Sequence, residues 1–482
     1  MDDCESYFVT PLKGPVPRRL ALFHGLGSVA YGIKDNGFST FLLIYYNQVL
    51  GMDAKLVSFA LMLALVIDAF LDPVIGHLSD RTYTRWGRRL PWLYLAPLPL
   101  ACSWLLLWAP PGPPTFAGLV LTAVVVRALV SCCEVPSVAL VPELTRDYDE
   151  RSRLIRFRFL FAWGGGLAIL FLAYDVFLVD GVLEPDGYFA YGLAGAVLIV
   201  VSVVVSALGQ HRWATGLPTH KPAPFSLGTA FGEIRESLTH PAFLILLAAG
   251  GLAYTSQGIT FSIANYLYLF VWRFGTGAFS LYPLLLFASV IACFFVVGPM
   301  HKRWGKRATG VASAVLGMVF WVIPFGLRHV GLWPIEGTLP SNAWLFGFFF
   351  VANLFSVAAM ISVSSMIADV VEASEAETGR RAEGTFYAGN FFMQKCATGL
   401  GIFVTGLLVD LSGMPEKARP GEVPAGVIDS LALGYAVIVV VFAIAIALIL
   451  RRFPITREDH AARVAALDAA ARADLDASGA HP

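Results

Sequence analysis

Two aspartates stand one helical turn apart in an otherwise apolar stretch of the sequence. Asp68 and Asp72 are four residues apart, which places both carboxylates on the same face of a helix. Two like charges at this spacing repel each other, and they are tolerated only with a bound cation or with a proton on one of them. The pair therefore favours a cation site over a purely structural pair of charges.

Other ionisable side chains also lie within apolar stretches, and they are Asp35, Arg127, Glu134, Arg158 and Lys395. Inside a membrane such a side chain costs roughly 2.5–3.5 kcal/mol, so it persists where it faces a partner or a watery cavity. The alternative explanation is that these residues form structural ion pairs that lock helices together. Arg127 precedes Glu134 by two helical turns, and the sequence leaves open whether the two form a relay or pair with other groups.

A pocket for a small polar solute also needs aromatic faces and groups that bond hydroxyls. The apolar stretches offer Tyr31, Trp163, Tyr254, Tyr387 and Asn390. Tyr31 lies one turn before Asp35, which puts the two on the same helix face. Among these residues, Asn390 is our candidate for a substrate-binding side chain.

The elements that must position these side chains are membrane-spanning helices. Hydrophobic residues make up 57% of the 482 residues and charged residues only 14%, against about 25% charged residues in a typical soluble domain. A membrane span needs about 20 mostly apolar residues. We expect an all-α membrane protein with twelve transmembrane helices, at 20–47, 54–79, 90–110, 115–142, 155–178, 187–208, 241–271, 278–300, 307–328, 341–368, 383–411 and 427–450.

The distribution of lysine and arginine sets the expected orientation. Most of these cations fall in the two terminal segments and in every second connection between spans. Such an excess marks the cytoplasmic side, so both termini are expected in the cytoplasm. The few cations expected on the outside are Lys55, Arg273, Arg328, Lys417 and Arg419.

The sequence contains an internal repeat. Arg85-Trp86-Gly87-Arg88-Arg89 follows the second span, and Arg303-Trp304-Gly305-Lys306-Arg307 follows the eighth. Two parallel six-helix halves are the layout of the major facilitator fold, with a site near the bilayer midplane between them. The expected domains are a cytoplasmic N-terminal segment (1–19), an N-terminal six-helix bundle (20–208), a cytoplasmic linker (209–240), a C-terminal six-helix bundle (241–451) and a cytoplasmic tail (452–482).

Several function classes are excluded. Lysine plus arginine equals aspartate plus glutamate at 34 each, whereas nucleic-acid binding favours a basic excess. The six cysteines are scattered and show no metal-ligand spacing. We find no nucleophile–base pair and no phosphate-binding loop, so we expect no enzymatic activity and no cofactor.

Many of these segments together resemble the glycoside–pentoside–hexuronide:cation symporter family. The resemblance spans residues 20 to 450. The matching segments are Lys34-Asp35, 68–92, Glu134-Val135-Pro136, Pro142-Glu143-Leu144-Thr145, Asp147–Arg151, Ile367–Val371, Gly379–Arg381, Glu383-Gly384 and Gln394-Lys395. The resemblance implies secondary transport by alternating access: symport of a sugar, glycoside or uronide with a cation across the inner membrane.

The resemblance also implies roles for individual residues. Asp68 and Asp72 form the coupling-cation site, to which Ser131 adds a hydroxyl. Asp35 and Glu134 accept sugar hydroxyls, with Arg158 and Lys395 completing the pocket. The residues implied in a cytoplasmic gate are Arg85, Arg88, Arg89, Asp147, Glu150 and Arg151.

The coupling cation is expected to be H⁺ or Na⁺. Leu71 stands where sodium-coupled members often carry an amide ligand. Because a hard cation needs several oxygen ligands, this departure slightly favours H⁺, and Na⁺ at Asp68 and Asp72 stays possible. Two alternatives remain open, a sodium-linked lysophospholipid carrier and a transporter-like sensor that binds a ligand without moving it. We expect a monomer in the bilayer.

Overall fold

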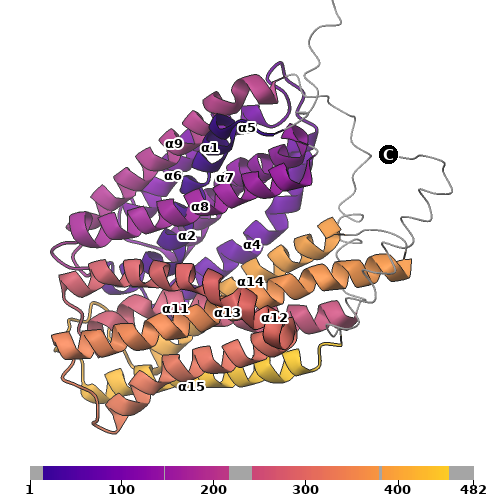
Figure 1. Ribbon diagram of the computed structural model, residues 1–482. Coiled ribbons are helices and arrows are strands. Elements are labelled where there is room, and N and C mark those ends of the chain that lie inside the picture. The colour runs from indigo at the N-terminus through magenta and orange to yellow at the C-terminus, as the bar shows by residue number, and fades with distance from the viewer. Residues whose placement is uncertain (1–14, 146, 216–240, 379–382, 455–482) are drawn as a thin grey trace, which may run out of the picture. The chain divides into compact units, whose positions relative to one another are not determined.

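A computed structural model describes residues 15–145, 147–215, 241–378 and 383–454 of the chain. Every regular element among these residues is a helix (Figure 1), which confirms the predicted all-α class. Most of the predicted N-terminal segment, linker and tail lies outside the described residues.

Nine helices of the described part are long and apolar enough to cross a membrane. They are α4 (Ala54–Asp80), α7 (Phe116–Leu144), α8 (Tyr148–Leu172), α9 (Asp186–Ala214), α11 (Pro241–Tyr266), α12 (Thr276–His329), α13 (Leu339–Thr378), α14 (Glu383–Leu411) and α15 (Ala425–Arg451). Two of them, α8 and α11, continue directly into one-turn π-helices, η3 (Ala173–Phe177) and η4 (Leu267–Val271).

Two of the expected spans are broken into shorter pieces. The first, 20–47, consists of α1 (Arg18–Leu26), α2 (Val29–Asn36), the π-helix η1 (Gly37–Phe41), α3 (Leu42–Ile44) and the π-helix η2 (Tyr45–Val49). The third, 90–110, consists of α5 (Leu90–Leu95) and α6 (Pro97–Trp108). Pro97 begins α6, where its missing N–H and its ring break the run of helical hydrogen bonds.

Two further expected spans, 278–300 and 307–328, lie in the single element α12. Gly305 interrupts this element with a φ of +78°. In the matching copy of the repeat, Gly87 has a φ of +84°. Glycine adopts this backbone conformation without steric cost, so both copies of the repeated motif place a glycine where the backbone leaves the right-handed helical region. The count of twelve spans and the side on which the termini lie stay predictions.

The chain forms two compact units. The first is drawn from Met1–Leu227, Gly258–Pro283 and Gly399–Ile428, and the second from Gly228–Gln257, Leu284–Thr398 and Asp429–Pro482. In the first unit α4 packs along α7, α2 against α8, and α6 against α9 (Figure 1). The predicted domain boundaries are not tested by this grouping and stay a prediction.

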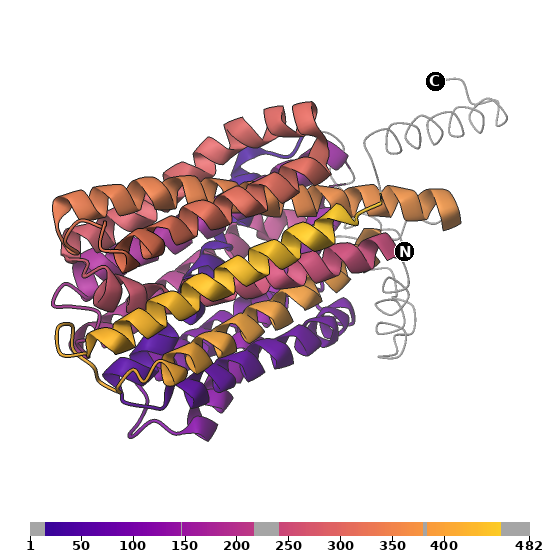
Figure 2. The same ribbon diagram turned by 90° about the horizontal axis from the view of Figure 1, so that it is seen from below.

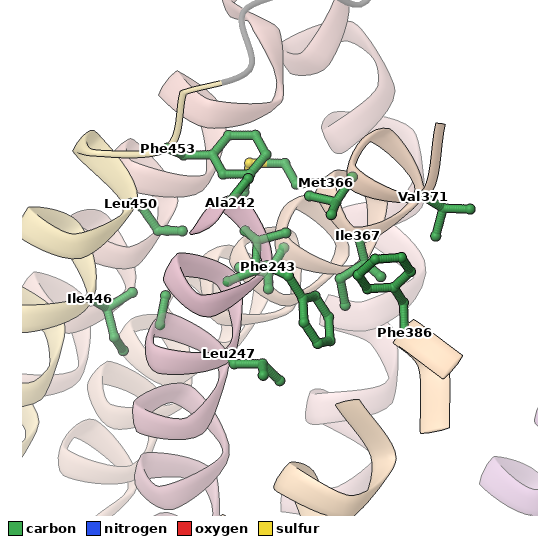
Figure 3. Close-up of a cluster of buried hydrophobic side chains, with 14 residues drawn as sticks. Ala242, Phe243, Leu247, Met366, Ile367, Val371, Phe386, Ile446, Leu450 and Phe453 are labelled. Atoms are coloured by element: carbon green, nitrogen blue, oxygen red, sulfur yellow. The ribbon is translucent and has the colours of Figure 1, made fainter. Parts of the chain in front are cut away.

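The second unit has an apolar core built from α11, α13, α14 and α15. Phe243 of α11 meets Phe386 of α14 edge to face, with ring centroids 4.8 Å apart. Met366 and Leu450 close the cluster from α13 and α15 (Figure 3). Figure 2 shows α15 as one unbroken helix. Such packing holds helices together in lipid, where the hydrophobic effect between them is absent.

Candidate transport site

The three residues predicted to bind a cation come together in the first unit. Asp68 and Asp72 lie on the face of α4 that packs along α7. The Ser131 hydroxyl oxygen on α7 lies 2.8 Å from Asp68 Oδ1 and 2.7 Å from Asp72 Oδ1. A serine hydroxyl carries one hydrogen and can donate it to only one of these carboxylates. The second contact is satisfied when one carboxyl group is protonated.

Arg127, whose role the sequence left open, is the ion-pair partner of Asp68. Its Nη2 and Nε lie 2.7 Å and 3.0 Å from Asp68 Oδ2, and its guanidinium lies 5.3 Å from the centre of the Phe38 ring. Arg127 is 4% exposed and Asp68 1%. Arg127 and Ser131 are one turn apart on α7, so they bind Asp68 from one helix face.

The acids predicted to accept sugar hydroxyls gather around Lys34, a residue that we did not assign to the site from the sequence. The Lys34 ammonium lies 2.7 Å from Asp35 Oδ1 and 3.7 Å from Glu134 Oε2. Lys34 is buried, whereas the Asp35 side chain is 65% exposed and that of Glu134 34%. The buried ammonium therefore holds two carboxylates whose other oxygens are accessible.

Arg158 of α8 extends the group of charged side chains around Glu134 by contacting α7 one turn further along. Its Nη1 donates to the Ser137 hydroxyl over 2.6 Å, and its guanidinium lies 5.5 Å from the centre of the Tyr31 ring. Ser137 is three residues beyond Glu134 and so lies near it on the same helix face. The close approach of α2 to α8 makes this arrangement possible: a Cβ on Gly32 would lie 1.9 Å from the Ala162 carbonyl oxygen.

Lys395 and Asn390 lie on α14, in the part of that helix that belongs to the second unit. Asn390 is buried, and its side chain is within hydrogen-bonding reach of Tyr254. Their participation in one pocket with the acids of the first unit stays a prediction.

Two of the three predicted gate residues after α4 contact one carboxylate. Arg88 Nη2 and Arg89 Nε lie 2.8 Å and 2.9 Å from Glu143 Oε1, at the end of α7. Arg89 also contacts Asp80 and Ser79. Arg85, by contrast, is exposed and lies over the Trp86 ring. In the second unit, Lys306 pairs with Asp369 of α13, so both copies of the repeat place a cation against an acid of a neighbouring helix.

The predicted gate residues after α7 organise the start of α8. The Asp147 carboxylate accepts a hydrogen bond from the Glu150 amide (3.0 Å) and so caps α8. The Glu150 carboxylate accepts from the Val16 amide (2.9 Å). Arg151 Nε donates to the Thr145 carbonyl (2.9 Å). A role for these groups in gating stays a prediction.

A multi-pass bundle of apolar helices with buried, mutually paired charges in its interior is the architecture of a membrane transporter. A family model described as MFS/sugar transport protein matches residues 23–457. The chain therefore belongs to the MFS/sugar transport protein family, and the resemblance to the glycoside–pentoside–hexuronide:cation symporters is confirmed.

Similar proteins agree with this assignment. The chain is 30% identical to an uncharacterized symporter of Synechocystis sp., over 83% of this chain and 87% of the relative. It is 27% identical to the isoprimeverose transporter of Lactiplantibacillus pentosus, over 83% and 82% of the two chains. The crystal structure of a mutant of the nucleoside transporter NupG superposes with a TM-score of 0.65 at 15% identity, covering 89% of this chain and 98% of that one, which confirms the major facilitator fold. The chain is thus a multi-pass secondary transporter of a symporter family.

Proposed function

We propose that this symporter carries a sugar, a glycoside or a uronide into the cell together with one cation, H⁺ or Na⁺. It acts as a monomer in the inner membrane, with both termini in the cytoplasm. The observation that carries the proposal is the link between the two predicted sites. Arg127 pairs with Asp68 of the cation site, and Glu134 of the substrate site lies two helical turns further along the same face of α7.

The predicted substrate site is suited to a solute that carries several hydroxyl groups. Carboxylates are strong acceptors for hydroxyl donors, and charge-assisted hydrogen bonds are the stronger kind. Asp35 and Glu134 present accessible oxygens while Lys34 fixes their positions. Arg158 adds a buried donor for ring or carboxylate oxygens. Such a pocket orients a sugar through several hydrogen bonds at once.

The charges of the predicted cation site provide a reason why binding of the cation and binding of the sugar are coupled. Asp68 and Asp72 bring two negative charges next to one guanidinium, so a single added cation or proton completes neutrality. Neutralisation lowers the cost of closing the helices around these groups. A coupling free energy of about 1–3 kcal/mol between the two solutes is enough to link their transport.

Electrical currents from reconstituted protein test the proposal directly. Monosaccharides, glycosides and uronides are added to proteoliposomes with and without sodium. We expect a saturable current with at least one sugar, and its loss in Asp72→Asn and Asp35→Asn. Asp186→Asn, at the exposed start of α9, serves as a matched control and should keep the current.

Other outcomes of these measurements would support one of the two alternative functions, a lysophospholipid carrier or a ligand sensor. No current with any sugar, together with sodium-dependent uptake of a lysophospholipid, would replace the sugar with a lipid substrate. Saturable sugar binding without flux would indicate a sensor. A sugar current unaffected by Asp72→Asn would contradict the proposed cation site while leaving sugar transport in place.

A further inference from the structure

Both carboxylate oxygens of Asp68 are already engaged within the protein. Oδ2 receives Arg127 Nη2 at 2.7 Å and Nε at 3.0 Å, and Oδ1 lies 2.8 Å from the Ser131 hydroxyl oxygen. The guanidinium therefore neutralises the Asp68 carboxylate through Oδ2, while Oδ1 faces the Ser131 hydroxyl.

Binding of a metal ion to the Asp68 carboxylate would be costly while Arg127 is paired with it. An arginine side chain keeps its charge under all physiological conditions, so a cation on Asp68 would stand beside a permanent positive charge. Arg127 is 4% exposed and lies against the Phe38 ring. Displacing it would leave a buried guanidinium without its carboxylate, which is strongly unfavourable.

The remaining oxygens are few for a hard cation. Sites for such ions are built from several oxygen ligands. With the charge of Asp68 balanced by Arg127, the three residues of the cation site offer Asp68 Oδ1, the Asp72 carboxylate and the neutral Ser131 hydroxyl. Leu71, between the two acids, supplies no side-chain oxygen. The guanidinium itself supplies the positive charge that a bound metal would otherwise bring.

We infer that Arg127 is a tethered counter-ion that replaces a metal ion at Asp68 and makes this symporter independent of sodium. The inference rests on the proposed cation role of Asp68 and Asp72, and it leaves the proton as the coupling cation. Arg127 is then a residue that determines ion specificity. Its removal should leave the charge of Asp68 unbalanced and so allow Na⁺ to bind between Asp68, Asp72 and Ser131.

Thermal unfolding of the purified full-length protein tests this inference without any transport assay. Melting is followed by tryptophan fluorescence in sodium chloride and in choline chloride of equal ionic strength. We expect no difference for the unmodified protein. Arg127→Gln should melt lower in choline because Asp68 loses its partner, and Na⁺ should raise its midpoint saturably by about 2–4 °C.

Two further variants separate binding from general effects of salt. In Arg127→Gln/Asp68→Asn the carboxylate is gone, so the Na⁺ response should disappear and the midpoint should recover. Arg153→Gln removes an arginine that is paired with Glu150 near the start of α8, and it should show no Na⁺ response. If Arg127→Gln is recovered folded only when purified in sodium, that dependence is itself the expected result.

Three outcomes overturn the inference. The first is a saturable Na⁺-dependent shift in the unmodified protein, which would leave the proposed symport intact with sodium as the coupling ion. The second is a folded Arg127→Gln that does not respond to Na⁺. The third is an Na⁺ response that persists in the double variant, because the ion would then bind elsewhere.

Discussion

The side-chain amide of Asn265 on α11 donates a hydrogen bond to the Thr40 carbonyl in η1 over 2.8 Å, although the two residues lie far apart in the sequence. The oxygen of the same amide accepts from the Tyr174 hydroxyl of η3, also at 2.8 Å. Asn265 is completely buried. One side chain thus ties three helical segments of the first unit together, two of them π-helices.

Replacing Asn265 by leucine should loosen this junction. The change leaves the Thr40 carbonyl and the Tyr174 hydroxyl buried without this partner, which costs about 1–3 kcal/mol of unfolding free energy. Amide hydrogen exchange over residues 37–49 should become faster. Ser280→Ala serves as a control because its bond to Asp175 (2.5 Å) is solvent-accessible, and it should change little. Equal exchange in the two variants would contradict the role given to Asn265.

The two acids of the cation site should respond differently to neutralisation. Asp68 is buried and paired with Arg127, whereas Asp72 is only partly buried. Asp68→Asn leaves a buried arginine without its carboxylate, and we expect a loss of about 3–5 kcal/mol in stability. Asp72→Asn should stay folded while cation-driven accumulation is lost. Thermal melts and uptake measured on the same preparations check both; equal melting of the two variants would contradict the burial difference.

The sequence alone predicts which residues of one helix share a face, because helix periodicity fixes that relationship. Asp68 and Asp72 share a face of α4 because four residues make about one turn. The contact of Ser131 with both acids was implied by the family resemblance and not by periodicity. The Arg-Trp-Gly repeat predicted two matching halves of the chain, and the structure adds that the glycine of each copy has a positive φ. The breaks within 20–47 were not predictable, because hydropathy does not reveal where a π-helical turn replaces an α-helical one.

Partners across helices were harder to predict. The pairing of Arg127 with Asp68 depends on α7 lying along α4, which no local pattern states. One signal was available: Arg127 and Ser131 have the same spacing as Asp68 and Asp72, as expected for two helices that meet at two successive turns. The role of Lys34 was likewise not predicted, because its contact with Glu134 depends on how α2 lies against α7.

Gly32 should not tolerate a side chain. A Cβ there would lie 1.9 Å from the Ala162 carbonyl oxygen, a backbone atom that cannot move aside without shifting α8. Gly32→Ala should therefore cost about 1–3 kcal/mol of stability and weaken substrate binding, since α2 also carries Lys34 and Asp35.

Gly164→Ala provides the matched control for Gly32→Ala. Gly164 lies on α8 with no heavy atom within 4 Å of an added Cβ, so the gain in helix propensity leaves stability unchanged or raised by up to about 1 kcal/mol. Melting curves and substrate affinity measured for both variants check the pair. Indistinguishable variants would mean that α2 and α8 are not held in close contact.

Arg89 and Arg85 belong to the same motif after α4, but we expect Arg89 to contribute more to the stability of the fold. Arg89 is 6% exposed and contacts Glu143, Asp80 and Ser79, whereas Arg85 is exposed and stacks on Trp86. Arg89→Gln should lower the unfolding free energy by about 1.5–3 kcal/mol, because charge-assisted hydrogen bonds at a buried position are lost. Arg85→Gln removes an exposed cation–π contact worth about 0.5–1 kcal/mol. Chemical denaturation of the two variants under identical conditions gives the comparison. A larger loss of stability in Arg85→Gln would mean that the contacts of Arg89 with Glu143 and Asp80 do not stabilise this end of the first unit.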